Sequence, residues 1–354
     1  EVRAKKALGQ HFLVDLNIAR KICDALSGGV RPEAGAETRA VAAGSADADA
    51  EIRTRVAGYA GAGAEARTMA VGSADAWAEA RTKATGTADA DAETRRGVVA
   101  SADARLAADT TAAGAPAAAE EERGGAVPCD VLEVGCGMGV LTQFLLRRGD
   151  ITTYGAEIDP ESVGYLHAHF PEFAPRLIEG DFLKMNLRER FPRGLKIIGN
   201  FPYNISSQIF FKVLEHRDLV PECVGMIQKE VAVRIAEPPG SKEYGILSVL
   251  LQAWYDIEYL FTVNETVFNP PPKVKSAVIR LRRNSVGRLG CDEALFVKVV
   301  KASFGQRRKM IRNSLRAVFG DFGGAEHPFF TQRAEQLSVA DFVQLTNWVA
   351  ANRK

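Results

Sequence analysis

A short apolar run that opens into a glycine-rich turn constrains the fold of this 354-residue chain more than any other segment. Residues 131–139 read Val-Leu-Glu-Val-Gly-Cys-Gly-Met-Gly, and a helical pattern follows from Leu141 to Arg148. Glycines in such a turn let the backbone approach a ligand closely, and a helix start offers N–H groups that have no partner within the helix. The spacing is G-x-G-x-G rather than the G-x-G-x-x-G of dinucleotide-binding folds. It therefore favours a nucleoside with an amino-acid tail over a pyrophosphate, and the alternative is a turn that binds nothing.

Two further apolar segments end in acidic residues that suit a nucleoside site. The segment 152–158 carries Glu157 about 20 residues after the glycines, where such folds place the acid that grips a ribose. The alternative is a helix N-cap, a role for which Asp159 before a proline is better suited. The segment 176–180 ends at Asp181, which could accept a hydrogen bond from an adenine amine. Parallel strands would bring these acids and the glycines to the carboxyl edge of one sheet, where open α/β sheets bind ligands.

The tetrapeptide Asn200-Phe201-Pro202-Tyr203 follows the apolar run 195–199, which is typical of a buried strand. The Asn200 side-chain oxygen and the carbonyl that precedes the Pro202–Tyr203 bond can both accept from an exocyclic amine, and Tyr203 offers a face on which a base can stack. Adenine's amine is a poor nucleophile because its lone pair is delocalised into the ring. Two acceptors that pull it toward tetrahedral geometry would free that lone pair. The alternative is a proline-stiffened turn between a strand and a helix, since short motifs often occur by chance.

Several blocks in order along the chain resemble the S-adenosylmethionine-dependent rRNA adenine dimethyltransferases, specifically the KsgA (RsmA) type, which modifies small-subunit rRNA. The resemblance covers most of the chain outside one insert. Its blocks are residues 6–13 (Lys-Ala-Leu-Gly-Gln-His-Phe-Leu), the glycine turn, Glu157, Asp181, residues 200–206, 228–231, 244–249, 268–274, 304–309 and 333–338.

The resemblance implies a Rossmann-like class I methyltransferase sheet and a set of site residues. In that family the cofactor S-adenosylmethionine is held at the positions of His11, Leu13, Gly135, Gly137, Glu157, Asp181 and Asn200. Catalysis would rest on Asn200, Pro202 and Tyr203, and Phe268 would lie near the target base, with an ordinary core aromatic as the alternative. Two residues depart from the family pattern: His11 stands where Asn is usual, and Phe201 replaces the common Leu.

Composition fits an intracellular enzyme, and we expect a cytoplasmic, monomeric protein that needs no metal. No pair of the five cysteines has C-x-x-C spacing, which argues against a zinc site or a disulfide framework. Cys136 lies inside the glycine turn and is interpreted as packing. No apolar run approaches the ~20 residues that would span a membrane.

Residues 36 to about 105 form a tandem repeat with a 14-residue period, seen in the register of Glu37, Glu51 and Glu65. Large apolar residues are nearly absent, so the repeat cannot bury a stacked core, and we expect a largely disordered or weakly helical insert. A partner-binding arm is the alternative. The insert, about 31–127, would interrupt a methyltransferase domain at 1–285, and residues 286–354 would form a small all-helical domain.

The chain outside the predicted insert, called the basic body below, carries a net positive charge. Residues 31–127 hold 11 Lys and Arg against 16 Asp and Glu, which leaves 34 against 28 elsewhere, a net charge of +6. No acid interrupts residues 294–320, where basic and apolar residues alternate at helical intervals. Beside a base-binding site this pattern favours phosphate contacts to folded RNA, and the alternative is a solvated basic face. The candidate substrate-binding residues are Phe268, Arg307, Arg308, Lys309 and Arg312.

The predicted fold is a doubly wound, mainly parallel α/β sheet that ends in an antiparallel pair, followed by helices. The predicted activity, which the resemblance implies, is methyl transfer to the exocyclic amines of two adjacent adenosines near the 3′ end of small-subunit rRNA during ribosome biogenesis. Two alternatives remain open: an Erm-type enzyme that acts on large-subunit rRNA, and a non-catalytic ribosome-assembly factor of the same fold.

Overall fold

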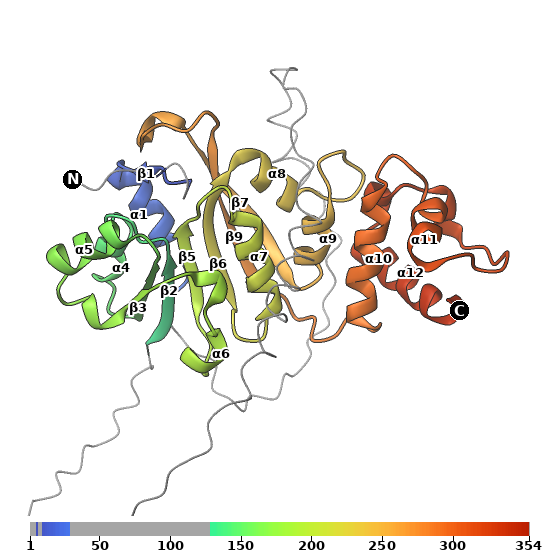
Figure 1. Ribbon diagram of the computed structural model, residues 1–354, viewed down its shortest axis with the longest axis horizontal. Coiled ribbons are helices and arrows are strands. Elements are labelled where there is room, and N and C mark those ends of the chain that lie inside the picture. Colours follow the sequence, from blue (N-terminus) through green and yellow to red (C-terminus); the bar gives the residue numbers. More distant parts are fainter. Residues whose placement is uncertain (1–4, 6–8, 29–127, 354) are drawn as a thin grey trace, which may run out of the picture. The chain divides into compact units, whose positions relative to one another are not determined.

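The computed structural model describes residues 5, 9–28 and 128–353, and the predicted repeat insert lies outside them. A seven-stranded sheet lies at the centre of the described residues, with the strand order β4-β3-β2-β5-β6-β9-β7 (Figure 1). Its strands are β2 (Cys129–Val134), β3 (Ile151–Glu157), β4 (Leu177–Glu179), β5 (Lys196–Asn200), β6 (Glu222–Gln228), β7 (Tyr255–Val263) and β9 (Ser276–Arg283). Strands β2 to β6 are parallel, and β9 lies antiparallel between β6 and β7. The predicted Rossmann-like α/β sheet with a terminal antiparallel pair is confirmed.

Helices cover both faces of the sheet because successive residues of its central strands point to opposite sides. On β2, Val131 contributes to the core that includes residues of α1 and α4, whereas Leu132 contributes to the core that includes residues of α7 and α9. All six residues of β2 are buried, as a strand covered on both faces requires. The helices are α1 (Leu16–Asp24), α4 (Thr142–Leu145), α5 (Pro160–His169), α6 (Leu187–Arg190), α7 (Ser206–Glu215), α8 (Lys229–Ala236), α9 (Ile246–Gln252), α10 (Glu293–Gly305), α11 (Ile311–Phe319) and α12 (Val339–Asn352).

One helix prediction needs correction at its end. The helix expected over Leu141–Arg148 is only α4, because the chain turns at residues 146–150 into β3, and the Arg148 guanidinium donates to the carbonyl of Leu26 at 2.9 Å. Helix α1 begins at Leu16 because Asp15 caps it by accepting from the backbone N–H groups of Asn17 and Ile18.

A two-stranded ribbon that the sequence did not predict joins distant parts of the chain. Strand β1 (Phe12–Leu13) pairs antiparallel with β8 (Phe268–Asn269), so the segment before α1 lies against the turn between β7 and β9. This pairing places residues 9–13 beside the carboxyl edge of the sheet.

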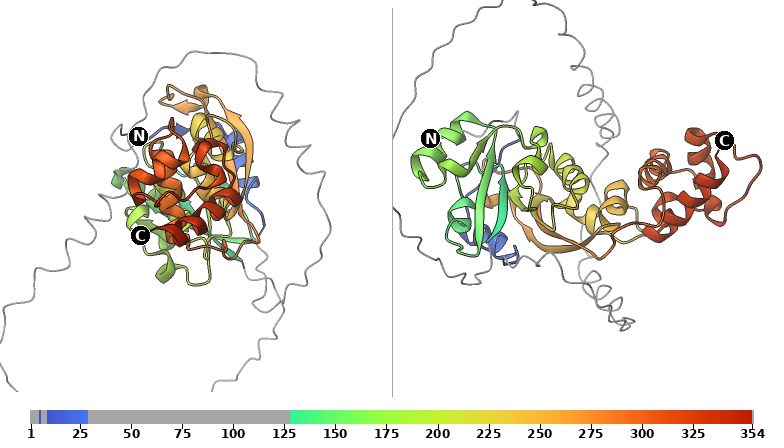
Figure 2. Two further views of the ribbon diagram at one scale, coloured as in Figure 1. Left: turned by 90° about the vertical axis from the view of Figure 1, so that its right-hand side faces the viewer. Right: turned by 90° about the horizontal axis from the view of Figure 1, so that it is seen from below.

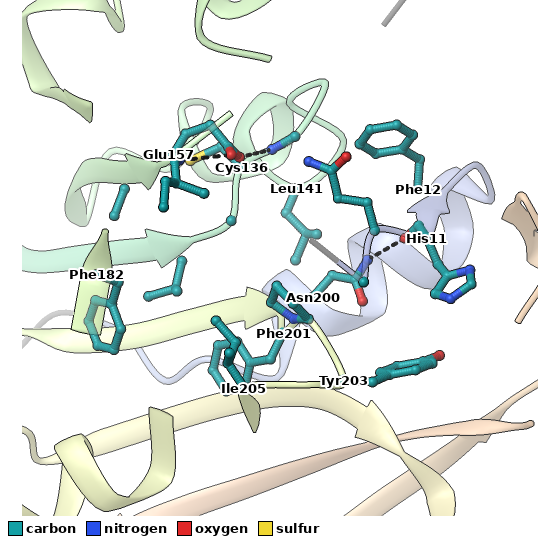
Figure 3. A pocket seen from close by; sticks show the side chains of 18 of the residues that line it. His11, Phe12, Cys136, Leu141, Glu157, Phe182, Asn200, Phe201, Tyr203 and Ile205 are labelled. Atoms are coloured by element: carbon teal, nitrogen blue, oxygen red, sulfur yellow. Dashed lines mark hydrogen bonds between the residues drawn. The ribbon is translucent and has the colours of Figure 1, made fainter. Parts of the chain in front are cut away.

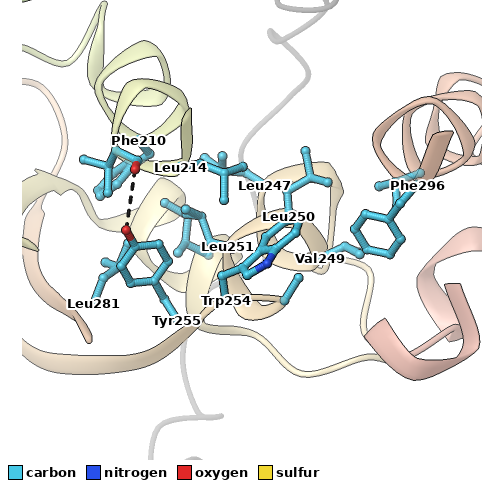
Figure 4. Close-up of a cluster of buried hydrophobic side chains, with 14 of the residues drawn as sticks. Phe210, Leu214, Leu247, Val249, Leu250, Leu251, Trp254, Tyr255, Leu281 and Phe296 are labelled. Atoms are coloured by element: carbon cyan, nitrogen blue, oxygen red, sulfur yellow. Dashed lines mark hydrogen bonds between the residues drawn. The ribbon is translucent and has the colours of Figure 1, made fainter. Parts of the chain in front are cut away.

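The C-terminal helices α11 and α12 each pack against α10 (Figure 2). Their core is continuous with that of the sheet region, because Trp254 makes an edge contact with Phe296 of α10, with ring centroids 6.0 Å apart (Figure 4). The expected helices after residue 286 are present, and the division into two domains at that residue stays a prediction.

The described residues that flank the insert lie at the amino edge of the sheet. Lys196, the first residue of β5, donates from Nζ to the carbonyls of Ser27 and Gly28, at 2.9 and 3.1 Å. On the other side of the insert, β2 begins at Cys129, opposite the first residue of β3. The insert therefore leaves and re-enters the described fold at the edge opposite the strand ends that carry the predicted site.

Over the described ranges, no helix is both long and apolar enough to cross a membrane. The same ranges contain no cluster of three or more His, Cys, Asp or Glu side chains placed to hold a metal ion.

Candidate active site

The glycine turn after β2 has a backbone that only glycine adopts readily. Gly135 and Gly137 have φ values of 75° and 54°, in the left-handed region where a side chain is strained. A Cβ on Gly137 would also lie 3.2 Å from the Phe12 ring. The turn thus presents bare backbone beside the Phe12 ring of β1, which is the property expected of a turn that cradles a ligand.

All the predicted catalytic and cofactor-binding residues line one cavity of about 210 Å³ (Figure 3). A cavity of this size is suited to an organic ligand, since a single water needs only roughly 10–15 Å³ by the same measure. The residues brought together are His11, Leu13, Gly135, Gly137, Glu157, Asp181, Asn200, Pro202 and Tyr203. They come from β1, the glycine turn, and the carboxyl ends of β3, β4 and β5, where parallel strands bring their ends to one edge.

Glu157 closes β3 with a carboxylate that is almost fully buried. Its Oε2 accepts from the N–H of Gly137 at 2.8 Å, and its Oε1 accepts from the N–H groups of Ile158 and Asp159, both at 2.9 Å. Burial raises the pKa of Glu157, and these three donors oppose the rise. A carboxylate has about four acceptor positions, so one remains for a hydroxyl of a bound ligand.

Asn200 ends β5, and its amide is oriented by the segment before α1. Its Nδ2 donates to the backbone carbonyl of His11 at 2.9 Å. Because this bond uses the amide nitrogen, the amide oxygen Oδ1 is the atom left to accept from a ligand. The other predicted acceptor, the Pro202 carbonyl, receives the N–H of Ile205 at 3.1 Å and keeps its second lone pair.

Tyr203 is half-buried, and both its hydroxyl and its ring make contacts within the chain. Its hydroxyl lies 2.5 Å from Oγ of Ser276, and burial raises its pKa. The His11 ring stacks on it with centroids 5.4 Å apart and planes at 29°, while Nδ1 of His11 donates to the Pro270 carbonyl at 2.9 Å. This separation is too small for a third ring between them, since stacked planes need ~3.5 Å each. A base that stacks on Tyr203 must use its other face or displace His11.

Asp181 follows β4 and has a double role. Its Oδ1 accepts from the N–H of Leu183 at 2.9 Å, which fixes the turn, while the residue also lines the cavity.

Sequence reasoning missed Ile158, which is 51% exposed and lines the same cavity. The available signal was an aliphatic residue directly after Glu157, at the end of the apolar segment 152–158.

Phe268 does not line this cavity. It is 4% exposed in β8 and belongs to the core that includes Leu13 and Val263. The structure thus places it as a core aromatic, the alternative that the sequence left open, and a stacking role for Phe268 would require the residue to move.

The four basic candidates divide into two kinds. Arg307 donates to the carbonyls of Lys242 and Tyr244, and Arg312 pairs with Glu326, so both serve contacts within the chain. Arg308 and Lys309 are exposed between α10 and α11. None of the four lines the cavity, and their contact with RNA stays a prediction.

The sheet order and the cavity at its carboxyl edge define a class I methyltransferase. A solved structure, that of a dimethyladenosine transferase from Plasmodium falciparum, has a TM-score of 0.54 and 26% sequence identity, and the match covers 63% of this chain and 90% of that one.

The sequence comparisons are more specific. Residues 128–351 match the ribosomal RNA adenine dimethylase family. Proteins named ribosomal RNA small subunit methyltransferase A from Parabacteroides distasonis and Bacteroides thetaiotaomicron are 61% and 60% identical over 218 and 221 residues. Those alignments cover 61% and 62% of this chain and 81% and 82% of the relatives. The chain belongs to the ribosomal RNA adenine dimethylase family, which confirms the resemblance read from its motifs.

Proposed function

We propose that this chain transfers methyl groups from S-adenosylmethionine to the exocyclic amines of two adjacent adenosines near the 3′ end of small-subunit rRNA. It acts as a monomer in the cytoplasm during ribosome biogenesis. The observation that carries the proposal is the orientation of Asn200, whose Oδ1 is left as an acceptor in the cavity that also contains the glycine turn and Glu157. The names of the relatives support the choice of small-subunit rRNA.

The residues around the cavity fit S-adenosylmethionine. The left-handed glycine turn allows close approach of a ligand's amino-acid tail, and Glu157 retains an acceptor position for a ribose hydroxyl. Asp181 and Ile158 supply a polar and an apolar contact for a purine ring. His11, Leu13 and Asn200 complete the set that would hold the cofactor. When bound, S-adenosylmethionine supplies an electrophilic methyl group on a sulfonium sulfur.

The chain's own residues position and activate the adenine amine. Oδ1 of Asn200 and the free lone pair of the Pro202 carbonyl accept its two N–H groups, which draws the nitrogen lone pair out of conjugation with the ring. Tyr203 stacks on the base and keeps the amine in line with the methyl group. Such positioning supplies a large part of a rate enhancement. After transfer the alkylated amine is acidic, so its proton can pass to water without a dedicated base.

The basic body supports RNA as the substrate. The chain outside residues 31–127 carries a net charge of +6, and Arg308 and Lys309 are exposed for phosphate contacts. Phosphate contacts position the RNA, whereas the cavity selects the base. The adenine must leave any stack to reach it, which costs a few kcal/mol, less in a loop.

Incubation of under-methylated ribosomal subunits with methyl-labelled S-adenosylmethionine tests the proposal. We expect label in dimethyladenosine of small-subunit rRNA. Label in large-subunit rRNA would favour the Erm-type alternative, and the absence of label in either subunit would favour a non-catalytic assembly factor.

Asn200→Ala tests the assigned chemistry. The variant loses an amine acceptor, so we expect turnover to fall at least roughly 100-fold, as for the loss of other preorganised hydrogen-bonding groups. Cofactor affinity, measured by calorimetry, should change far less. Equal losses of turnover and cofactor affinity would reject the role given to Asn200.

A further inference from the structure

Phe201 lies between the two residues that are proposed to accept from the amine, and it lines the same cavity. It is fully buried, and its ring makes an edge contact with Phe210 of α7, with centroids 5.8 Å apart at 74°. Its backbone N–H donates to the carbonyl of Met226 on β6 at 3.0 Å. Phe201 is therefore tied to the sheet by its backbone and to α7 by its ring.

Two glycines make the space for this ring. Gly199 of β5 and Gly225 of β6 are register partners on neighbouring strands. A Cβ on Gly225 would lie 2.4 Å from Cε2 of Phe201, and a Cβ on Gly199 would lie 2.8 Å from Cε1. Carbon atoms in contact are normally about 3.5–4.0 Å apart. The ring thus occupies a notch in the sheet, formed by Gly199 and Gly225, that closes if either glycine gains a side chain.

We propose that Phe201 is a positioning residue whose ring, seated in the notch of Gly199 and Gly225, sets the orientation of the Asn200 and Pro202 acceptors. Gly225 is then a residue that determines activity although it touches neither substrate nor cofactor. This inference rests on the proposed methyl transfer, because it concerns the groups that hold the amine.

The geometry indicates how large the effect is. A methyl group on Gly225 forces the ring to move by about 1 Å to restore a normal contact. The ring is one residue from both acceptors, so the displacement passes to Asn200 and Pro202. A misplacement of this size can lower turnover by roughly 100-fold when the reacting groups depend on alignment. The cofactor's other contacts, from the glycine turn and Glu157, lie on β2 and β3 and are not displaced.

A double-mutant cycle on Gly225 and Phe201 tests the proposal. We expect Gly225→Ala to lower kcat at least tenfold while the dissociation constant for S-adenosylmethionine stays within threefold. Phe201→Leu removes the ring atoms that the new methyl group would meet. The double variant Gly225→Ala/Phe201→Leu should therefore recover kcat to within threefold of Phe201→Leu alone.

Gly199→Ala is the matched control. Its Cβ would also meet the Phe201 ring, but it would lie 2.5 Å from the backbone carbonyl of Val134 as well. Shortening Phe201 cannot relieve a backbone clash, so Gly199→Ala/Phe201→Leu should be no more active than Gly199→Ala. Thermal unfolding of each variant separates loss of fold from loss of positioning.

The proposal is overturned if Gly225→Ala keeps kcat within threefold of the unsubstituted chain. It is also overturned if the double variant Gly225→Ala/Phe201→Leu does not recover kcat to within threefold of Phe201→Leu alone. If Gly225→Ala does not fold, Phe201→Leu decides alone: a fall in kcat with unchanged cofactor affinity supports the positioning role, and an unchanged kcat overturns it. Failure of the proposed function would appear differently, as a lack of cofactor binding or methylation by the unmodified chain.

Discussion

Replacement of Glu133 by Gln should change how the stability of the chain depends on pH. Glu133 lies on β2 behind the glycine turn and is fully buried. Its Oε2 accepts from the Thr142 hydroxyl at 2.6 Å, while Oε1 has no hydrogen-bond partner within the described residues. Burial raises the pKa of Glu133 to about 8, the Thr142 hydrogen bond opposes the rise, and the nearby Glu157 carboxylate adds to it.

The sign and size of the effect follow from this raised pKa. The unfolded chain loses the Glu133 proton near pH 4.5, whereas the folded chain keeps it to about pH 8. Between these values the folded state binds more protons, so the free energy of unfolding falls as pH rises, by about 1.4 kcal/mol per pH unit for one proton. Over the whole window the loss is on the order of 5 kcal/mol. Gln is neutral at every pH and keeps an acceptor for Thr142, so it removes this loss.

Urea unfolding of both proteins from pH 5.5 to 8.5 gives the measurement. We expect Glu133→Gln to be more stable by about 1 kcal/mol at pH 5.5 and the advantage to grow with pH, reaching a few kcal/mol at pH 8. Some pH dependence will remain, because the pKa of Glu157 is also raised by burial. The exposed Glu172 supplies the control, and Glu172→Gln should leave the slope unchanged. Parallel slopes for Glu133→Gln and the original chain would refute the reasoning.

Two further outcomes concern the part of the fold that flanks the insert. Lys196→Met should lower the free energy of unfolding by roughly 3 kcal/mol, because it removes the cation 3.1 Å from the buried Glu222 and leaves that carboxylate with the more distant Arg282, at 3.8 Å. The double variant Lys196→Met/Glu222→Met should lose less free energy of unfolding than Lys196→Met alone. A loss equal to the sum of the losses in the two single variants would contradict the pairing. Deletion of residues 36–105 should leave methylation within a few-fold, since Gly28 and Cys129 lie at the sheet edge opposite the cavity; complete loss of activity would show that the repeat is needed for function.

The order of the strand ends was available from the sequence. Buried parallel strands appear as apolar runs, and each run here is followed by a residue with ligand-binding chemistry: Gly135, Glu157, Asp181 and Asn200. Parallel strands place such residues at one edge whatever the remaining packing. For this reason the sheet and the edge that carries these four residues followed from local patterns, whereas His11 and Leu13 were implied by the family resemblance.

Contacts between distant segments were not available in the same way. The pairing of β1 with β8 buries Phe268 and brings the His11 carbonyl to Asn200, although these segments are far apart in the chain. A local pattern carries no information on such a pairing, because the same residues could pair elsewhere.

The sequence by itself thus determined the class of fold and the edge of the sheet that carries the cavity, because periodicity and strand-end chemistry are local properties, and the resemblance of its motif blocks indicated the family. Only the tertiary structure decided which atoms orient Asn200, that Glu133 is buried with an unpaired oxygen, and that Gly225 makes room for Phe201. Those features depend on distances between strands and helices brought together by folding, and burial and steric fit exist only once those elements are packed.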